Sequence, residues 1–136
     1  MPSYWIVKTE PSTYSYDDLH RDGKTVWDGV RNNLALKHIR SMAKGDEVLV
    51  YHSGADKALA GLAVVASDPY PDPKAKDEKL AVVDLRAVKP LPRCVTLAEI
   101  KADGGFKELA LVRMPRLSVM PVPVGLWKRL VKMAGS

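Results

Sequence analysis

One stretch of the chain is apolar on both faces of an extended strand, and it limits the folds that the sequence can adopt. The predicted strand 47–52 contains Val48, Leu49, Val50 and Tyr51 in succession. Because successive side chains of a strand point to opposite faces, an unbroken apolar run needs cover on both sides. This strand is therefore predicted to lie in the middle of a sheet.

The segment that follows predicts an antiparallel partner for this strand. Residues 53–56, Ser-Gly-Ala-Asp, have the composition of a turn, and a strand of small residues is predicted over 58–66. The proline-rich segment 68–77 is expected to be a surface loop, and residues 90–92, Pro-Leu-Pro, are expected to end a strand. Aromatic or β-branched runs predict the other strands, over residues 4–7, 80–88 and 117–120, and residues 24–27 are expected to be extended or to form a short strand.

Capping residues and apolar spacing predict several short helices. Ser15 is expected to cap a helix over 16–21, and Thr96 with Glu99 matches a capping box. Five or six strands with short helices form an α+β pattern. Pairing of the first strand with later strands would close a small barrel, although periodicity alone leaves closure open. Amphipathic helices are predicted over residues 34–42, capped by Asn32 or Asn33, and over residues 124–133.

The length of the chain, 136 residues, suits a single domain over residues 1–136. Hydrophobic residues make up 46% and charged residues 27%, and no apolar run approaches the roughly 20 residues that a membrane helix needs. The N-terminal residues lack the order of a secretory signal. We expect a cytoplasmic monomer without a membrane partner, associated with the nucleoid if nucleic acid is bound.

Charge is distributed unevenly along the chain, whose net charge is +5. Residues 86–136 contain ten Lys or Arg against three Asp or Glu, a net charge of +7, whereas residues 1–85 contain eleven against thirteen, a net charge of −2. A basic C-terminal third suits an anionic partner, nucleic acid first and an acidic protein or lipid surface second. Solvated lysines on an ordinary surface would give the same count.

Residues 25–33, TVWDGVRNN, place a tryptophan beside hydrogen-bonding groups in a segment that must turn. Gly29 permits a positive φ, and Asn32 or Asn33 begins a helix, so backbone amides are expected near Trp27. An indole face with directed donors suits a planar ring rich in heteroatoms, and stacking contributes roughly 1–3 kcal/mol per base. The same residues would also suit a core tryptophan followed by helix-capping asparagines.

The end of the strand 47–52 is a second candidate for the site. Pockets often form where strands end, and the chain has Tyr51, His52 and Ser53 at this point. Ser53 could bond the edge of a base, while Tyr51 or His52 could form a wall of the pocket. The alternative is an ordinary hairpin turn in which the serine hydroxyl bonds its own backbone.

Lys8, Thr9 and Glu10 form a third candidate at the end of the first predicted strand. Side chains two residues apart on an extended chain point the same way, so Lys8 and Glu10 are expected on one side. They suit a small hydrolase that acts on a modified nucleoside. A surface salt bridge, which is the more common arrangement, would use the same two residues.

Other chemistry has little support in the sequence. The histidines His20, His38 and His52 share no metal-binding spacing, so we expect no metal site. The one cysteine, Cys94, excludes an internal disulfide and follows a Pro-Leu-Pro turn without a neighbouring base. No glycine-rich phosphate loop and no nucleophile elbow occur, and we expect no cofactor.

Several short stretches that together cover nearly the whole chain form a set. They are YWIVKTEP (4–11), YSYDDL (14–19), TVWDGVRNN (25–33), GDEVLVYHS (45–53), VVASDPYPDP (64–73), LPRCVTLAEIKAD (91–103) and RLSVMPV (116–122). In this order they resemble the EVE domain family of the PUA-like superfamily. The resemblance implies a five- or six-stranded pseudo-barrel flanked by short helices. It also implies recognition, without catalysis, of DNA or RNA whose modified base, a methylated or hydroxymethylated cytosine or a modified adenine, lies in an aromatic pocket.

The resemblance further implies roles for single residues. Trp27 would be the stacking platform, while Asp28, Asn32 and Asn33 would contact the edge of the base and Ser53 would face them from the opposite strand end. Family members often carry an aromatic residue where this chain has Asn33, so the pocket is expected to be more open, or that aromatic residue only flanks it. The implied rim or phosphate contacts are Trp5, Lys8, Arg31, Arg116 and Ser118.

Three functions stay open on the sequence. The first is a binding module for modified nucleic acid, with Trp27 and Tyr51 among its base-binding residues. The second is the small hydrolase that uses residues 8–10. The third is an interaction domain whose basic face meets an acidic protein. Neither the identity of the base nor the choice between DNA and RNA follows from the residues.

Overall fold

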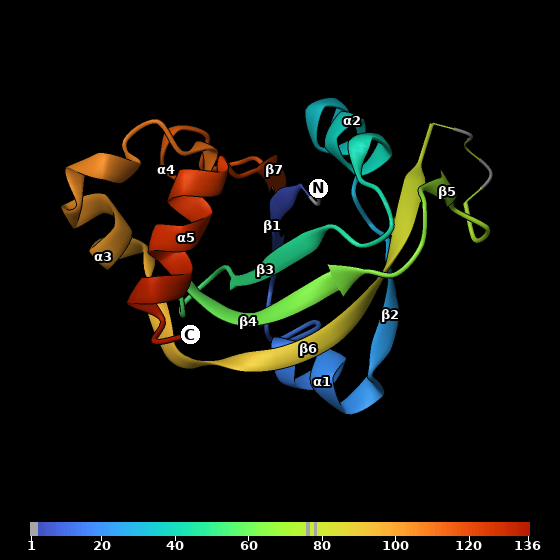
Figure 1. Cartoon of the computed structure of the whole chain (residues 1–136). Coiled ribbons are helices and arrows are strands. Elements are labelled where there is room, and N and C mark those ends of the chain that lie inside the picture. Colours follow the sequence, from blue (N-terminus) through green and yellow to red (C-terminus); the bar gives the residue numbers. More distant parts are fainter. Residues whose placement is uncertain (1–2, 76, 78) are drawn as a thin grey trace.

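Strand β3 (Glu47–His52) occupies the central position that its apolar run predicts (Figure 1). The computed structural model describes residues 3–75, 77 and 79–136. Strand β3 pairs in parallel with β1 (Tyr4–Thr9) and antiparallel with β4 (Ala58–Val65). The predicted hairpin of β3 and β4 is therefore confirmed.

Across the described residues the sheet has seven strands and is curled (Figure 1). In the described residues, the two strands at the ends of the sheet, β2 and β7, do not pair with each other. The predicted α+β pseudo-barrel is therefore confirmed as a half-barrel that is not closed. The strand beyond the predicted five or six is β5, which lies where the sequence predicts a surface loop. The order is β2 (Lys24–Trp27), β6 (Ala81–Thr96), β4, β3, β1 and β7 (Val119–Pro121), with β5 (Tyr70–Pro71) paired to β6.

Strand β6 contradicts the prediction that the Pro-Leu-Pro segment ends a strand. It continues through Pro90 and Pro92 to Thr96. Pro90 lies opposite Gly61 of β4, between two shifts of register in the ladder that joins β4 and β6. Bulges interrupt regular pairing, so a residue without an N–H group is tolerated there. The sequence pattern did not reveal these bulges because they depend on both strands.

Short helices pack around the half-barrel (Figure 1). Ser15 caps α1 in a capping box with Asp18, Asn32 caps α2, and Thr96 with Glu99 forms the predicted capping box of α3. The sequence missed the two shortest helices, η1 and α4. Among the described residues, no helix combines the length and apolar character needed to cross a membrane. The helices are α1 (Tyr16–Asp22), α2 (Asn33–Ser41), α3 (Leu97–Ala102), η1 (Gly104–Phe106), α4 (Ala110–Arg113) and α5 (Val124–Met133).

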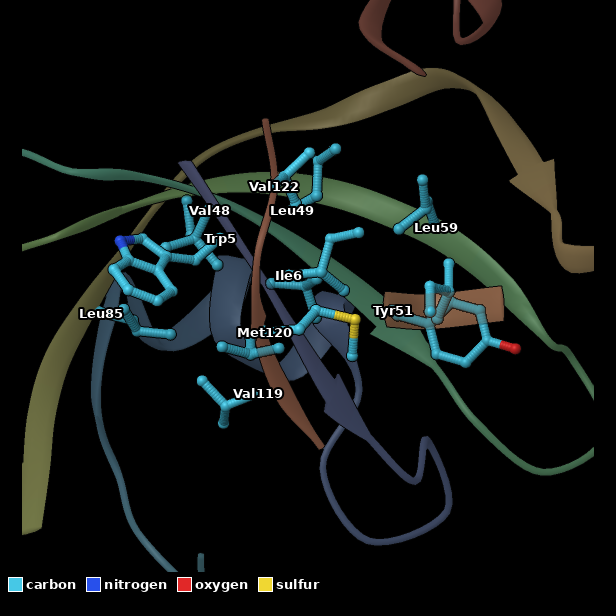
Figure 2. Close-up of a cluster of buried hydrophobic side chains, with 14 of the residues drawn as sticks. Trp5, Ile6, Val48, Leu49, Tyr51, Leu59, Leu85, Val119, Met120 and Val122 are labelled. Atoms are coloured by element: carbon cyan, nitrogen blue, oxygen red, sulfur yellow. The ribbon is translucent and has the colours of Figure 1, made fainter. Parts of the chain in front are cut away.

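The hydrophobic core fills the concave side of the curled sheet (Figure 2). Ile6 of β1, Leu49 of β3 and Met120 of β7 are fully buried there. Helix α2 packs against both β7 and β6, and it buries Leu36 and Ile39. This helix therefore covers the inside of the half-barrel next to its open side, where β2 and β7 remain unpaired.

Helix α1 is fixed to the sheet by Tyr16, whose hydroxyl donates to the carbonyl of Leu62 at 2.6 Å. A Cβ atom at Gly61 would overlap carbon atoms of the Tyr16 ring. We expect Gly61→Ala to lower the free energy of unfolding by about 1–3 kcal/mol, because the ring or the strand must move. Urea denaturation measures this change.

Gly125→Ala provides a matched control. Gly125 is exposed within α5, and a Cβ atom there meets nothing within 4 Å. The same substitution should raise the free energy of unfolding by up to about 1 kcal/mol, because alanine favours the helix more than glycine does. Equal effects at the two positions would contradict the proposed packing of Tyr16 on β4.

Candidate functional site

A cavity of about 460 Å³ lies at the open side of the half-barrel. One wall comes from β2 and the segment after it, and the other comes from β1, the segment after it and Ser118 before β7. The two ends of the sheet thus face each other across the cavity. Its volume falls in the range that is typical of small-molecule and cofactor sites. The lining residues are Lys8, Thr9, Thr13, Tyr14, Thr25, Val26, Trp27, Asp28, Gly29, Val30, Arg31 and Ser118.

Trp27 is the last residue of β2, and its side chain is 7% exposed while it lines the cavity. Gly29 has a φ of 78°, and its positive φ lets the chain turn directly after the tryptophan. No described residue accepts a hydrogen bond from the indole N–H, and no fully buried side-chain nitrogen or oxygen there lacks a partner. The indole N–H therefore reaches accessible space and can donate to a ligand.

Lys8 forms part of the opposite wall, and a hydrogen bond holds its ammonium group in place. Its Nζ donates to the carbonyl oxygen of Pro115 at 2.8 Å and lies 5.6 Å from the centre of the Tyr51 ring. Burial lowers the pKa of Lys8 from its usual value, because removal from water disfavours the charged form. One N–H of the ammonium group is engaged by Pro115, which leaves donors for an acceptor in the cavity.

The segment between β1 and α1 completes this wall and is tied internally. The Thr9 hydroxyl donates to the carbonyl of Tyr14 at 2.6 Å, and the backbone amides of Thr13 and Tyr14 both donate to the carbonyl of Glu10 at 2.9 Å. The Tyr14 hydroxyl donates to Asp22 at 2.8 Å, and burial raises the pKa of Tyr14. These bonds give the cavity a shaped, polar side.

Five of the predicted site residues meet at this cavity. Trp27 and Asp28 lie on the β2 side with Arg31, while Lys8 and Ser118 lie on the other side. The backbone amide of Lys8 donates to the carbonyl of Ser118 at 2.9 Å, which places these two residues next to each other. Arg31 and Asp28 are exposed, so their charges stand at the mouth of the cavity.

The other predicted base contacts do not line the cavity. Asn32 is exposed and its side chain accepts from the amide of Ala35 at 3.0 Å, so it is the helix cap. Asn33, the first residue of α2, is exposed. Tyr51 is 3% exposed and packed in the core, and Nζ of Lys8 lies 5.6 Å from the centre of its ring. Ser53 donates through Oγ to the carbonyl of Thr9 at 3.3 Å, behind the wall.

Trp5 and Arg116 were the remaining rim predictions. Trp5 does not line the cavity: it is 5% exposed within the core, and its indole N–H donates to Asp46 at 2.9 Å, so nothing in this geometry supports a rim contact from it. An aromatic residue near a strand end has the same sequence signal in a core as at a rim. Arg116 is exposed in the turn before Ser118 and lies outside the lining, so a phosphate contact from it stays a prediction.

The residues that the sequence missed come mainly from the segment before α1 and from β2. Thr13 and Tyr14 line the cavity, as do Thr25 and Val26. Tyr14 belongs to the stretch YSYDDL that supports the family resemblance, so its position in that stretch was the one available signal. Nothing local in the sequence indicates that this segment faces Trp27.

The arrangement of residues 8–10 does not favour the hydrolase. Lys8 and Thr9 line the cavity, whereas Glu10 does not and accepts instead from the Ser12 hydroxyl at 3.2 Å. Among the described residues, no ion pair joins Lys8 to Glu10. Within the residues that the structure describes, no group of three or more His, Cys, Asp or Glu side chains is placed to hold a metal ion.

Comparison with known proteins identifies relatives over nearly the whole chain. Human thymocyte nuclear protein 1 is 32% identical over 156 residues, which cover 90% of this chain and 69% of the human protein. The solution structure of a protein from Rhodopseudomonas palustris matches with a TM-score of 0.93 and 41% identity, covering 98% of this chain and 93% of that chain. The crystal structure of human thymocyte nuclear protein 1 in complex with DNA containing 5-methylcytosine matches with a TM-score of 0.89 and 27% identity, covering 98% of each chain.

The family model for the EVE domain matches residues 3–133, which include every element of the half-barrel. The stretches that suggested this resemblance are distributed over the same range. The chain therefore belongs to the EVE domain family.

Proposed function

We propose that this chain is a DNA-binding module that accepts a modified cytosine in the cavity beside Trp27. The observation that supports the proposal is this cavity, which is lined by Trp27 on one side and by Lys8, Thr9 and Thr13 on the other. The human relative with the same fold was crystallised with DNA that contains 5-methylcytosine. A base bound here must first leave the base stack of the duplex, because a paired base inside the duplex cannot enter a cavity of the protein.

The lining suits a single flat heterocycle. We expect the base to stack on the Trp27 ring, an interaction that contributes about 1–3 kcal/mol per base. Donors and acceptors around it can meet the polar edge of a pyrimidine: the Trp27 indole N–H and the ammonium group of Lys8 donate, while Asp28 accepts. Val26, which lines the cavity and is 40% exposed, can provide apolar surface for a substituent such as a 5-methyl group.

Electrostatic attraction must supplement the stack, because extruding a base costs a few kcal/mol. The three carboxylates of residues 86–136 are each paired with an arginine: Glu99 with Arg93, Asp103 with Arg129 and Glu108 with Arg113. The net charge of +7 in this part of the chain therefore remains as lysines and arginines without a local counter-charge. These side chains can contact phosphates along the duplex.

A binding panel tests the proposed function. Duplexes of one sequence would carry cytosine, 5-methylcytosine, 5-hydroxymethylcytosine or N6-methyladenine at one position, and an RNA strand with methylated adenine would be a further arm. We expect tighter binding to at least one modified cytosine than to the plain duplex. Equal affinity for modified and plain duplexes would remove the proposed base recognition, and preference for the adenine arms would move it to another base.

Salt separates the two contributions to binding. Between 50 and 200 mM salt, we expect the affinity for every duplex to fall roughly 10- to 100-fold, as about two to four phosphate contacts require. The ratio of affinities for modified and plain duplexes should stay constant, because stacking and hydrogen bonds to an uncharged base release no counterions from the phosphates. Fluorescence anisotropy titrations at both salt concentrations measure both quantities. A ratio that collapses with salt would show that the preference is electrostatic.

A further inference from the structure

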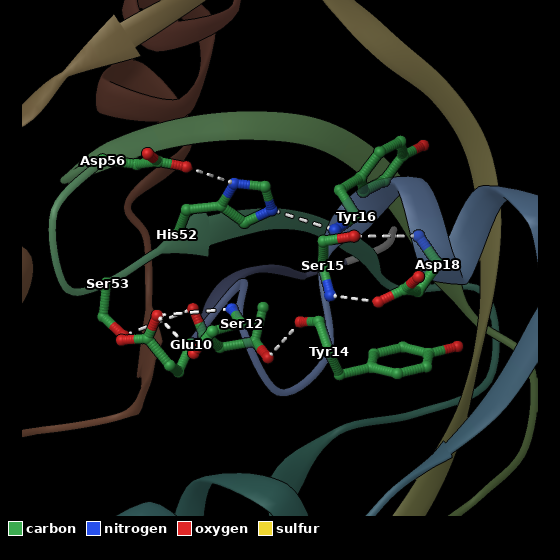
Figure 3. Close-up of polar contacts among 10 residues, drawn as sticks. Glu10, Ser12, Tyr14, Ser15, Tyr16, Asp18, His52, Ser53 and Asp56 are labelled. Atoms are coloured by element: carbon green, nitrogen blue, oxygen red, sulfur yellow. Dashed lines mark hydrogen bonds and ion pairs between the residues drawn. The ribbon is translucent and has the colours of Figure 1, made fainter.

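His52, the last residue of β3, bonds through both nitrogens of its ring (Figure 3). Nε2 lies 2.9 Å from the backbone nitrogen of Tyr16, and Nδ1 lies 3.3 Å from Oδ2 of Asp56. The Tyr16 N–H is a donor, so Nε2 must accept, and the ring proton must then be on Nδ1, where it faces the carboxylate. The arrangement therefore requires a neutral imidazole in one defined tautomer.

The Tyr16 amide depends on this acceptor. Tyr16 is the first residue of α1, and the first amides of a helix have no partner inside the helix. The Ser15 hydroxyl, which caps α1, accepts from the amide of Asp18 at 3.0 Å rather than from Tyr16. His52, whose side chain is only 14% exposed, is thus the partner that satisfies the Tyr16 N–H.

The neighbouring residue holds the other end of the same segment. The Ser53 amide donates to the carbonyl of Thr9 at 2.9 Å, and the Ser53 hydroxyl approaches the same carbonyl. The end of β3 therefore fixes the chain at Thr9 and again at Tyr16. Between these two points lie Thr13 and Tyr14, which form the wall of the cavity that faces Trp27.

We propose that His52 is a positioning residue, which in its neutral form holds the cavity wall 9–16 in place and makes recognition of the modified base sensitive to pH. The inference rests on the proposed function for its effect on binding, but the bond to Tyr16 exists without DNA. Protonation puts an N–H on Nε2 opposite the N–H of Tyr16, so this hydrogen bond is lost. The wall then loses the backbone attachment at Tyr16, while the bonds from Ser53 to Thr9 and from the Tyr16 hydroxyl to Leu62 remain.

The groups around His52 act in opposite directions. The Asp56 carboxylate, on the turn after β3, lies 3.3 Å from Nδ1 and favours the charged ring. The Tyr16 amide, at the start of α1, lies 2.9 Å from Nε2 and opposes it, because it needs an unprotonated acceptor.

The direction of the pH effect on the preference for the modified duplex distinguishes it from general electrostatic attraction to DNA. Lower pH adds positive charge to a protein and so strengthens its general attraction to DNA. Loss of the neutral His52 acceptor instead lowers the preference for the modified over the plain duplex. We expect this preference to fall about 3- to 10-fold between pH 8 and pH 5.5, which is the value of one hydrogen bond.

Variants of His52 test the role of its neutral ring. In His52→Gln the side-chain amide oxygen can replace Nε2 as acceptor but does not titrate, so the preference should persist and become independent of pH. In His52→Asn the amide is too short to reach Tyr16, so the preference should be low at both pH values. His20→Gln is the control, because His20 is an exposed histidine whose ring lies 6.3 Å from that of Tyr16, and it should keep the pH dependence of the wild type.

The nitrogen chemical shifts of the His52 ring provide a readout that needs no DNA. At pH 8, NMR of the protein alone should show Nε2 unprotonated and Nδ1 protonated. A proton on Nε2, or an unchanged pH dependence in His52→Gln, would overturn the role of His52. If the wild type shows no preference for any modified duplex at pH 8, the proposed function fails, while the ring shifts still decide whether His52 holds Tyr16.

Discussion

Replacement of Trp27 by leucine is expected to lower the affinity for the preferred modified duplex roughly 5- to 150-fold. Stacking of a base on an aromatic ring contributes about 1–3 kcal/mol, and leucine fills part of the volume without offering a ring face. Trp27 lines the cavity and is the one tryptophan in its lining. Affinity for the plain duplex should change much less, because phosphate contacts are untouched. Anisotropy titrations with both duplexes measure the two effects.

Trp127→Leu is the matched control for this experiment. Trp127 in α5 is 6% exposed, packs 4.7 Å from the ring of Tyr4 and lies outside the cavity lining. Both substitutions remove a buried indole, so both lower stability, and binding must be measured where both variants are folded. Equal losses of selective binding in the two variants would show that the effect comes from general destabilisation rather than from a base on Trp27.

The largest expected loss of stability comes from Asp46→Ala. Asp46 is 5% exposed, and its carboxylate accepts three hydrogen bonds at 2.9–3.0 Å, from the amides of Ser3 and Ala43 and from the indole N–H of Trp5. Alanine leaves these donors without an acceptor, and hydrogen bonds to a charged group are stronger than neutral ones. The free energy of unfolding should fall by about 3–5 kcal/mol. Urea denaturation measures the change.

Two further variants define the cause of this loss. Glu47→Ala removes the adjacent carboxylate, which is exposed, and should change the free energy of unfolding by no more than about 0.5 kcal/mol. Asp46→Asn keeps one acceptor oxygen but turns an amide donor toward other donors, so its effect should be intermediate. A loss below about 1 kcal/mol in Asp46→Ala would mean that the three donors find water instead.

Local signals predicted most elements of the fold. The strand 47–52 and the helix 124–133 appear within the predicted bounds, and the caps Ser15 and Thr96 begin the helices that they were expected to begin. Each of these signals depends on side chains within a few residues of each other. Where a partner strand matters, as at Pro90, the prediction was wrong because the bulges that accommodate the proline involve β4.

The candidate site divides in the same way. Trp27, Asp28 and Arg31 lie in one short segment of the chain, so a sequence pattern can indicate them together. Their opposite wall comes from residues 8–14 and Ser118, which reach the cavity because β1 and β7 form one end of the sheet while β2 forms the other. The resemblance to the EVE domain family indicated Lys8 and Ser118 as site residues. Neither the resemblance nor the residue pattern indicated Thr13 or Tyr14.

The sequence alone determined which strand is central, which residues cap α1 and α3, and which family the chain resembles, because these properties depend on neighbouring residues and on their order. The tertiary structure alone decided that the half-barrel stays open, that Trp5 belongs to the core, and that Trp27 faces a cavity. These properties depend on the curl and register of the sheet, which bring together residues more than one hundred positions apart, such as Lys8 and Pro115. No local pattern carries that information.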